Sequence, residues 1–127
     1  MPVNVVNAAP SRAVPPQGNR VYEYYVRFAG DGTLDATRSS QGVSVSSDTG
    51  GEYTVTLPGR GGCVIMGATA TVQDANGQLI GVLTTKSQTD ASRVVVLEHL
   101  EEVAGTLVAT DLASTEDVFA RILVSQL

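Results

Sequence analysis

Histidine and cysteine carry much of the acid–base and nucleophilic chemistry that proteins perform near neutral pH, and the chain has one of each. The histidine, His99, lies beside Glu98, Glu101 and Glu102. A zinc site needs three or four ligands of suitable softness, which one imidazole among glutamates does not readily supply. We therefore expect the His99 side chain to be solvated, with a metal site formed with its glutamates as the minor alternative.

The single cysteine, Cys63, follows the glycine-rich stretch 59–62 and begins an apolar run. A nucleophilic thiol needs a neighbouring base and an electropositive setting, and neither is evident here, so we expect a buried, inert thiol. A phosphate-binding loop needs a preceding strand, a following helix and, in its Walker form, Gly-Lys before Ser or Thr. The stretch 59–62 lacks these features and is interpreted as a flexible connector.

Carboxylates occur at two spacings that a calcium site could use. Residues 74–77, Asp-Ala-Asn-Gly, lead directly into an apolar stretch and predict a tight turn instead. Asp31 and Asp35 supply only two of the roughly six or more oxygens that calcium needs, so a cation there is a minor alternative. The absence of tryptophan weakens a glycosidase or carbohydrate-binding module, whose sugars stack on flat rings. We expect no enzyme activity, no catalytic residue, no metal and no cofactor.

Composition restricts the class of protein. The 127 residues suffice for one domain, and 43% hydrophobic against 17% charged residues indicates a chain that can bury a core. The formal charge of −5 disfavours nucleic-acid binding, because phosphate backbones attract basic proteins. One cysteine allows no internal disulfide, and the chain has neither a membrane-length apolar run nor a secretory signal pattern. We expect synthesis in the cytoplasm and no membrane partner.

Residues 1–20 are expected to form an extended arm. Four of the five prolines lie in the first sixteen residues, where they fix φ and remove backbone donors. The arm also carries apolar residues that a solvated tail would not need, namely Val3, Val5, Val6 and Val14. We expect these valines to bind a partner, by adding a strand to an exposed edge or by lying across it. A frayed terminus is the alternative.

From residue 21 onward, apolar residues alternate with polar ones, as in half-buried strands. Strands are predicted at 21–29, 43–46, 52–57, 68–73, 79–86, 94–97 and 118–124. Turn residues at 48–51 and the Asn-Gly pair at 76–77 predict two hairpins. The stretches 94–97 and 118–124 are apolar on both faces, which predicts central strands or strands covered by a neighbouring subunit.

Only residues 98–105 offer a helical pattern, and we expect one turn there at most, ended by Gly105. Alternation places at least two of the four tyrosines in the core; these are Tyr22, Tyr24, Tyr25 and Tyr53. The predicted fold is all-β: a β-sandwich, jelly-roll-like or Ig-like, of seven or eight short antiparallel strands that spans residues 21–127 as one domain.

Several segments share their pattern of strands and turns with one known group of proteins. They are Phe28-Ala29-Gly30-Asp31-Gly32, Gly42-Val43-Ser44-Val45, Tyr53-Thr54-Val55-Thr56-Leu57, the stretch 68–73 with its Asn-Gly turn, and Thr110-Asp111-Leu112-Ala113. In these segments the chain resembles small all-β virion proteins of tailed bacteriophages, the capsid decoration or cement proteins. Ser46-Ser47-Asp48 stands where that group usually has a basic residue, so no role for such a charge is carried over.

The resemblance implies a structural role on the outside of a virion. The protein would bind the major capsid protein, commonly as a homotrimer, and bridge neighbouring subunits of the shell through several weak contacts. Acidic residues would face solvent or a basic patch of the shell; these are Glu98, Glu101, Glu102 and Asp111. The two-faced strand 118–124 would pack subunits together through Val118, Phe119, Ile122 and Leu123.

The alternative is a recognition module of a different class. A tail- or surface-associated β-domain would bind a receptor or glycan through loops 30–41 and 59–66, because loops on a rigid scaffold often carry binding. Such a module would bind its ligand in a saturable manner, and its binding would depend little on the arm.

Overall fold

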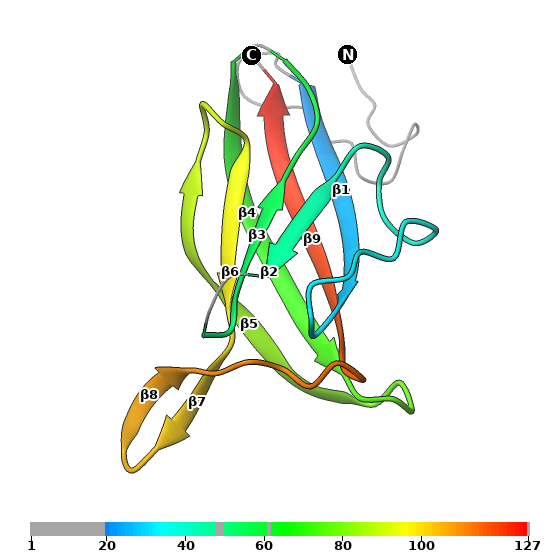
Figure 1. The fold of residues 1–127 in the computed structure, drawn as a ribbon. Helices are drawn as coiled ribbons and strands as arrows, with labels where there is room; N and C mark the ends of the chain where they lie inside the picture. The colour runs from blue at the N-terminus through cyan, green and yellow to red at the C-terminus, as the bar shows by residue number, and fades with distance from the viewer. Residues whose placement is uncertain (1–19, 48–49, 61, 127) are drawn as a thin grey trace.

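A computed structural model describes residues 20–47, 50–60 and 62–126 (Figure 1). Within these ranges all the secondary-structure elements are strands, so the prediction of an all-β protein is confirmed. The arm residues Val3, Val5, Val6 and Val14 lie outside the described residues.

The described part of the chain contains nine strands. They are β1 (Arg20–Ala29), β2 (Ser44–Ser47), β3 (Glu52–Thr56), β4 (Cys63–Gln73), β5 (Leu79–Thr89), β6 (Val94–Glu98), β7 (Leu100–Val103), β8 (Thr106–Ala109) and β9 (Asp117–Gln126). Seven of these coincide with the predicted strands, although β4 begins before residue 68 and β5 continues beyond residue 86.

The prediction of a helical turn at 98–105 is wrong. This stretch contains β7 and the turn that joins it to β8, and the two strands pair with each other as a separate antiparallel hairpin. Ala104 and Gly105 connect the two strands, and both have positive φ (53° and 84°), as a tight hairpin turn requires. Gly105 is therefore a turn glycine and not the end of a helix.

The other seven strands form one antiparallel sheet in the order β1-β9-β4-β5-β6-β3-β2. β9 and β6, the two stretches that are apolar on both faces, are central strands as predicted. The sheet curls so that β3 and β2 lie across from β9 and β1 (Figure 1). It remains one continuous sheet, and two separate packed sheets are not seen in the described residues.

The curl occurs at β5, which changes partner along its length. Its first half, from Leu79 to Leu83, pairs with β4, whereas residues 84–89 pair with β6. Where β4 and β5 separate, side chains replace the missing backbone ladder. Asp90 Oδ1 accepts from the Ile65 amide at 2.9 Å, and Gln88 Nε2 donates to the Ile65 carbonyl at 2.9 Å. The sheet can therefore bend here without leaving these buried polar groups unpaired.

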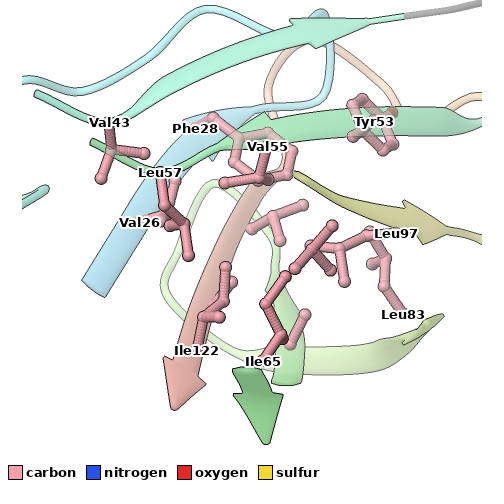
Figure 2. Packing of buried hydrophobic residues seen from close by; sticks show 14 of the residues in the cluster. Val26, Phe28, Val43, Tyr53, Val55, Leu57, Ile65, Leu83, Leu97 and Ile122 are labelled. Atoms are coloured by element: carbon pink, nitrogen blue, oxygen red, sulfur yellow. The ribbon is translucent and has the colours of Figure 1, made fainter. Parts of the chain in front are cut away.

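The inner face of the curled sheet forms the core, as Figure 2 shows. Phe28 of β1 and Tyr53 of β3 come from the two facing halves, and their ring centroids are 5.1 Å apart. The buried Tyr53 hydroxyl donates to the Gly30 carbonyl at 2.7 Å and accepts from the Leu112 amide at 3.3 Å. Tyr53 thus ties β3 to two loops as well as filling the core.

The core cluster draws on both halves of the sheet. Its buried residues are Val26, Phe28, Val43, Tyr53, Val55, Leu57, Cys63, Ile65, Ala70, Val72, Leu83, Val95, Leu97, Leu112, Val118, Ala120, Ile122 and Val124. Of the tyrosines, Tyr53 is buried and Tyr24 is half-buried and packs against the core, whereas Tyr22 and Tyr25 are 38% and 37% exposed.

The free edge of β1 is covered by the loop that follows it. The Tyr25 amide donates to Ser40 Oγ, and the Ser40 amide donates back to the Tyr25 carbonyl. The Arg27 amide likewise donates to Ser39 Oγ, and the Arg27 carbonyl accepts from the Asp35 amide. Because unpaired edges invite association with other strands, this loop protects the second half of β1.

We predict that Tyr53→Phe lowers the free energy of unfolding by about 1–3 kcal/mol, because it leaves the buried Gly30 carbonyl and Leu112 amide without their partner. Chemical denaturation followed by circular dichroism measures this loss. Tyr22→Phe is the matched control, since Tyr22 is an exposed residue and loss of its hydroxyl should change stability by less than about 0.5 kcal/mol. Equal effects of the two substitutions would contradict the role given to Tyr53.

We also predict that acid weakens the loop over β1. The Thr37 hydroxyl and amide both donate to Asp35 Oδ1, and the hydroxyl contributes most to lowering the pKa of Asp35. A carboxyl whose pKa is lower in the folded state stabilises that state above its unfolded pKa, and this stabilisation is lost as pH falls through the folded pKa.

An NMR titration of the Asp35 carboxyl carbon measures the effect. The midpoint should lie below that of an unfolded aspartate and should move upward in Thr37→Val, which removes the hydroxyl donor. Identical midpoints in the two proteins would show that Thr37 does not hold the loop.

Candidate functional site

The residues singled out for chemistry are used structurally. In the described ranges no group of three or more His, Cys, Asp or Glu side chains could hold a metal ion. Asp31 Oδ1 accepts the Thr33 amide, and Asp74 Oδ1 accepts two amides of its predicted turn. Cys63 is buried as predicted, and its thiol donates to the Asp90 carbonyl at 3.3 Å. These groups stabilise turns and strand ends.

His99 fixes the base of the β7–β8 hairpin. Its amide donates to the Gly51 carbonyl at 3.0 Å, and the Thr110 amide donates to the His99 carbonyl at 2.9 Å. The ring Nδ1 lies 2.9 Å from the Thr110 carbonyl oxygen, and since a carbonyl only accepts, Nδ1 must carry the proton. The Gly51 amide in turn donates to Asp111 Oδ1 at 2.7 Å. His99 is half-buried and bonded, which corrects the expectation of a merely solvated side chain.

Beyond this base the hairpin projects from the body of the protein, as Figure 1 shows at its lower end. β6 pairs with β5 as far as the Thr84–Glu98 pair, and β7 then departs from β5. The separation leaves a cavity of about 410 Å³, called here the β5–β7 groove. It is lined by Val72, Ile80, Gly81, Val82, His99, Leu100, Glu101, Leu112 and Glu116.

Most of the exposed large apolar side chains of the described chain lie on β5 or on the hairpin that borders this groove. Six of the ten exposed large hydrophobic residues of the described chain belong to the first half of β5 or to the hairpin. They are Leu79, Ile80, Val82, Val103, Leu107 and Val108, with exposed fractions between 42% and 67%. Exposed apolar residues gathered in one region of a soluble domain commonly mark a binding surface.

The two predicted shell-contact residues both lie on β7. Glu101 pairs in register with Val108, and Glu102 pairs with Leu107. Because side chains alternate along a strand, the two glutamates are on opposite faces of the hairpin, each beside an exposed apolar residue. Glu101 also lines the β5–β7 groove. Both faces of the hairpin are therefore apolar and acidic.

The predicted subunit-packing residues of β9 divide between its two faces. Val118 and Ile122 are fully buried in the core of this chain, so they have no surface left for a neighbouring subunit. Phe119 and Leu123 lie on the opposite, outer face, where both are half-buried. The prediction of subunit packing is kept only for these two, because the curled sheet itself covers the inner face of β9.

Several outer-face side chains of β1 and β9 bond to one another. The rings of Tyr25 and Phe119 stack with centroids 6.1 Å apart. Glu23 accepts from the Tyr25 hydroxyl and pairs with Arg121, and these contacts, that of Tyr25 foremost, lower the pKa of Glu23. Leu123 and Arg121 also line a second cavity of about 260 Å³ beside β4.

Arg93 has a structural role that the sequence pattern did not reveal. It is buried, and its guanidinium donates to the Arg60 carbonyl and to Gln126 Oε1, both at 2.8 Å. Gly59 has a φ of 124°, which residues with a side chain rarely adopt, and a Cβ there would also lie 2.9 Å from the guanidinium, so glycine is favoured at this position. The Gly62 carbonyl accepts from Gln126. The described part of stretch 59–62 is thus a hydrogen-bonded loop, not the flexible connector expected from its glycines.

The groove was also missed by sequence reasoning, although one signal was present. The sequence pattern predicts a hairpin strand over residues 79–83, Leu-Ile-Gly-Val-Leu, yet this run is apolar on both faces. In the structure only Leu83 of this run is buried. Apolar residues on the solvent side of a strand that is not covered could have indicated a docking surface.

No family model, curated protein or solved structure matches the chain. No helix capable of crossing a membrane occurs in the ranges that the structure describes. The surface of the protein itself is therefore the basis for assigning a function.

We predict that Gly51→Ala loosens the hairpin more than Gly50→Ala does. Both glycines have positive φ (77° and 74°), so both substitutions carry the cost of a left-handed residue, about 1–2 kcal/mol. Only at Gly51 would the new Cβ collide, 2.3 Å from the Thr110 carbonyl oxygen, whereas nothing lies within 4 Å at Gly50.

Hydrogen exchange of the His99 and Thr110 amides measures the effect, because these amides close the hairpin base. Gly51→Ala should reduce their protection well below that in Gly50→Ala. Equal protection in the two variants would show that the contact between Gly51 and Thr110 does not hold the hairpin.

Proposed function

We propose that this protein is a structural virion protein, a capsid decoration or cement protein that binds the outer surface of the major capsid shell. It is made in the host cytoplasm, joins the virion and bridges neighbouring shell subunits, as a homotrimer. The observation that carries this proposal is the projecting hairpin, whose exposed Val103, Leu107 and Val108 contribute little to the core of the chain.

The hairpin is suited to attachment for two physical reasons. Its base is fixed by the bonds among Gly51, His99 and Thr110, so little conformational freedom is lost when its tip binds. Its tip combines apolar side chains with Glu101 and Glu102, which complement a shell surface that is apolar and basic. Burial of the apolar residues supplies affinity, and the glutamates supply orientation.

Bridging needs more than one attachment point per particle. Several weak contacts held in one oligomer raise the effective concentration of each, so a trimer with three hairpins binds far more tightly than one copy. Phe119 and Leu123 on the outer face of β9 are the candidates for packing between copies. In this proposal the curled sheet serves as the sandwich-like scaffold, jelly-roll-like or Ig-like, that holds these surfaces apart.

We predict that Leu107→Ser with Val108→Ser abolishes binding to the shell without unfolding the protein. Both side chains are exposed, so their loss should cost the fold less than about 0.5 kcal/mol each. Co-sedimentation of purified protein with capsid shells from the same source measures binding. The unaltered protein should pellet at a fixed copy number per shell.

Met66→Ser is the matched control, because Met66 is 54% exposed and lies on β4, away from the hairpin. It should pellet as the unaltered protein does. Failure of the unaltered protein to pellet would reject the proposed function and favour the receptor- or glycan-binding module. Pelleting of the double variant would show that the hairpin is not the attachment surface.

A further inference from the structure

The β5–β7 groove contains an unprotected strand edge. Residues 79–83 bond to β4 on one side, and on the other side no strand of the described chain pairs with them. The corresponding edge of β1 is covered by the Ser39 and Ser40 loop, whereas no described residue covers β5 in this way. An open edge flanked by exposed Ile80 and Val82 is suited to receive an additional strand.

We propose that this edge is occupied by the N-terminal arm of a second copy of the chain, with residues 3–9 forming the added strand. This stretch, Val-Asn-Val-Val-Asn-Ala-Ala, has the length of a typical strand and contains no proline, whereas Pro2 and Pro10 flank it. Val3 and Val5 share one face of such a strand, as groove-facing residues must. The flanking prolines are tolerated because the added strand is itself an edge.

Charge favours the same occupant. Among the described residues, the groove is lined by Glu101 and Glu116 and by no lysine or arginine. Residues 1–19 contain no carboxylate and one basic side chain, Arg12. The strand 3–9 is therefore mostly apolar and carries no charged side chain, and the basic Arg12 follows three residues after it. An apolar groove lined by glutamates repels such a segment less than it repels the acidic remainder of the chain, which favours the arm as the occupant.

Geometry favours an arm from another copy over the chain's own arm. β1 begins beside Gln126, at the opposite end of the sheet from the groove (Figure 1). The ten residues of β1 extend about 33 Å, and three strand spacings from β1 to β5 add about 14 Å across the sheet. Residues 10–19 span at most about 36 Å, so the chain's own arm would reach only when fully taut. A neighbouring copy has no such restriction.

Arm exchange would explain how copies of the protein are joined in the proposed function. It rests on that proposal in one respect, namely that several copies act together on a shell. Each exchanged arm joins two subunits by main-chain hydrogen bonds, and a closed ring of exchanges gives the cyclic oligomer that bridging requires. Exchange itself can be measured on isolated protein without any shell.

Cysteine cross-linking of full-length chains tests the exchange. A chain with Val5→Cys is mixed with a tagged chain of different mass that carries Val82→Cys, and the mixture is oxidised with glutathione disulfide. The matched control replaces Val82→Cys by Val64→Cys, since Val64 is also an exposed strand valine and lies outside the groove. Cys63 stays in place because it is buried, and wild-type chain mixed with Val5→Cys measures any reaction with it.

The mixed disulfide between Val5→Cys and Val82→Cys chains should form about 100-fold faster than that with Val64→Cys, because a docked arm raises the local thiol concentration from micromolar towards millimolar. Adding Glu101→Lys to the groove chain should slow it a few-fold by reversing a lining charge. Equal rates for the two partners would overturn the proposal.

A second test uses a diluted double variant that carries both Val5→Cys and Val82→Cys in one chain. If its disulfides form only within single chains, the exchange proposal is overturned and the groove is assigned to the chain's own arm. The two proposals fail separately. Protein that exchanges arms but does not pellet with shells rejects the proposed function alone, and protein that pellets without exchange rejects only the arm proposal.

Discussion

The structure depends on one constraint: an antiparallel sheet with an apolar face must cover that face itself, because no helix of the described chain packs on it. The sheet meets this constraint by curling, and the curl is possible because β5 exchanges β4 for β6 as its partner midway along its length. Asp90 and Gln88 bond to Ile65 where the ladder opens, so the bend costs few hydrogen bonds. The core, with Phe28 packed against Tyr53 across the curl, follows from this one change of partner.

The same change of partner creates the surface to which we assign function. After Glu98 the chain leaves the sheet, so β5 keeps an open edge and β7 stands away from it as one wall of the groove. The hairpin is held at its base through His99 and Gly51, and the residues of its tip are exposed on both faces. Scaffold and docking surface are in this sense consequences of one bend, and a substitution that altered the bend would affect both.

Much of the fold could be predicted because alternation is a local property. The residues two positions away from any strand residue already show which side of the strand is apolar. This alternation predicted seven of the strands, and the Asn-Gly pair predicted the hairpin between β4 and β5. The pattern failed at 98–105, where loosely grouped apolar residues and Gly105 fitted a helix end as well as a hairpin turn. It also failed for Val118 and Ile122, since an apolar residue has the same appearance in a subunit interface as in the core of its own chain.

The sequence by itself therefore determined the all-β class, the positions of most strands, the acidic charge and the buried state of Cys63. Only the tertiary structure decided which edges are covered and which face of β9 is internal. It also decided that His99 bonds to Gly51 and Arg93 to Arg60, which are far from them in sequence. The physical reason is the range of the interactions. Strand formation and turn chemistry act over a few residues, whereas pairing order and edge protection join segments separated by tens of residues, and no local pattern encodes which segments meet.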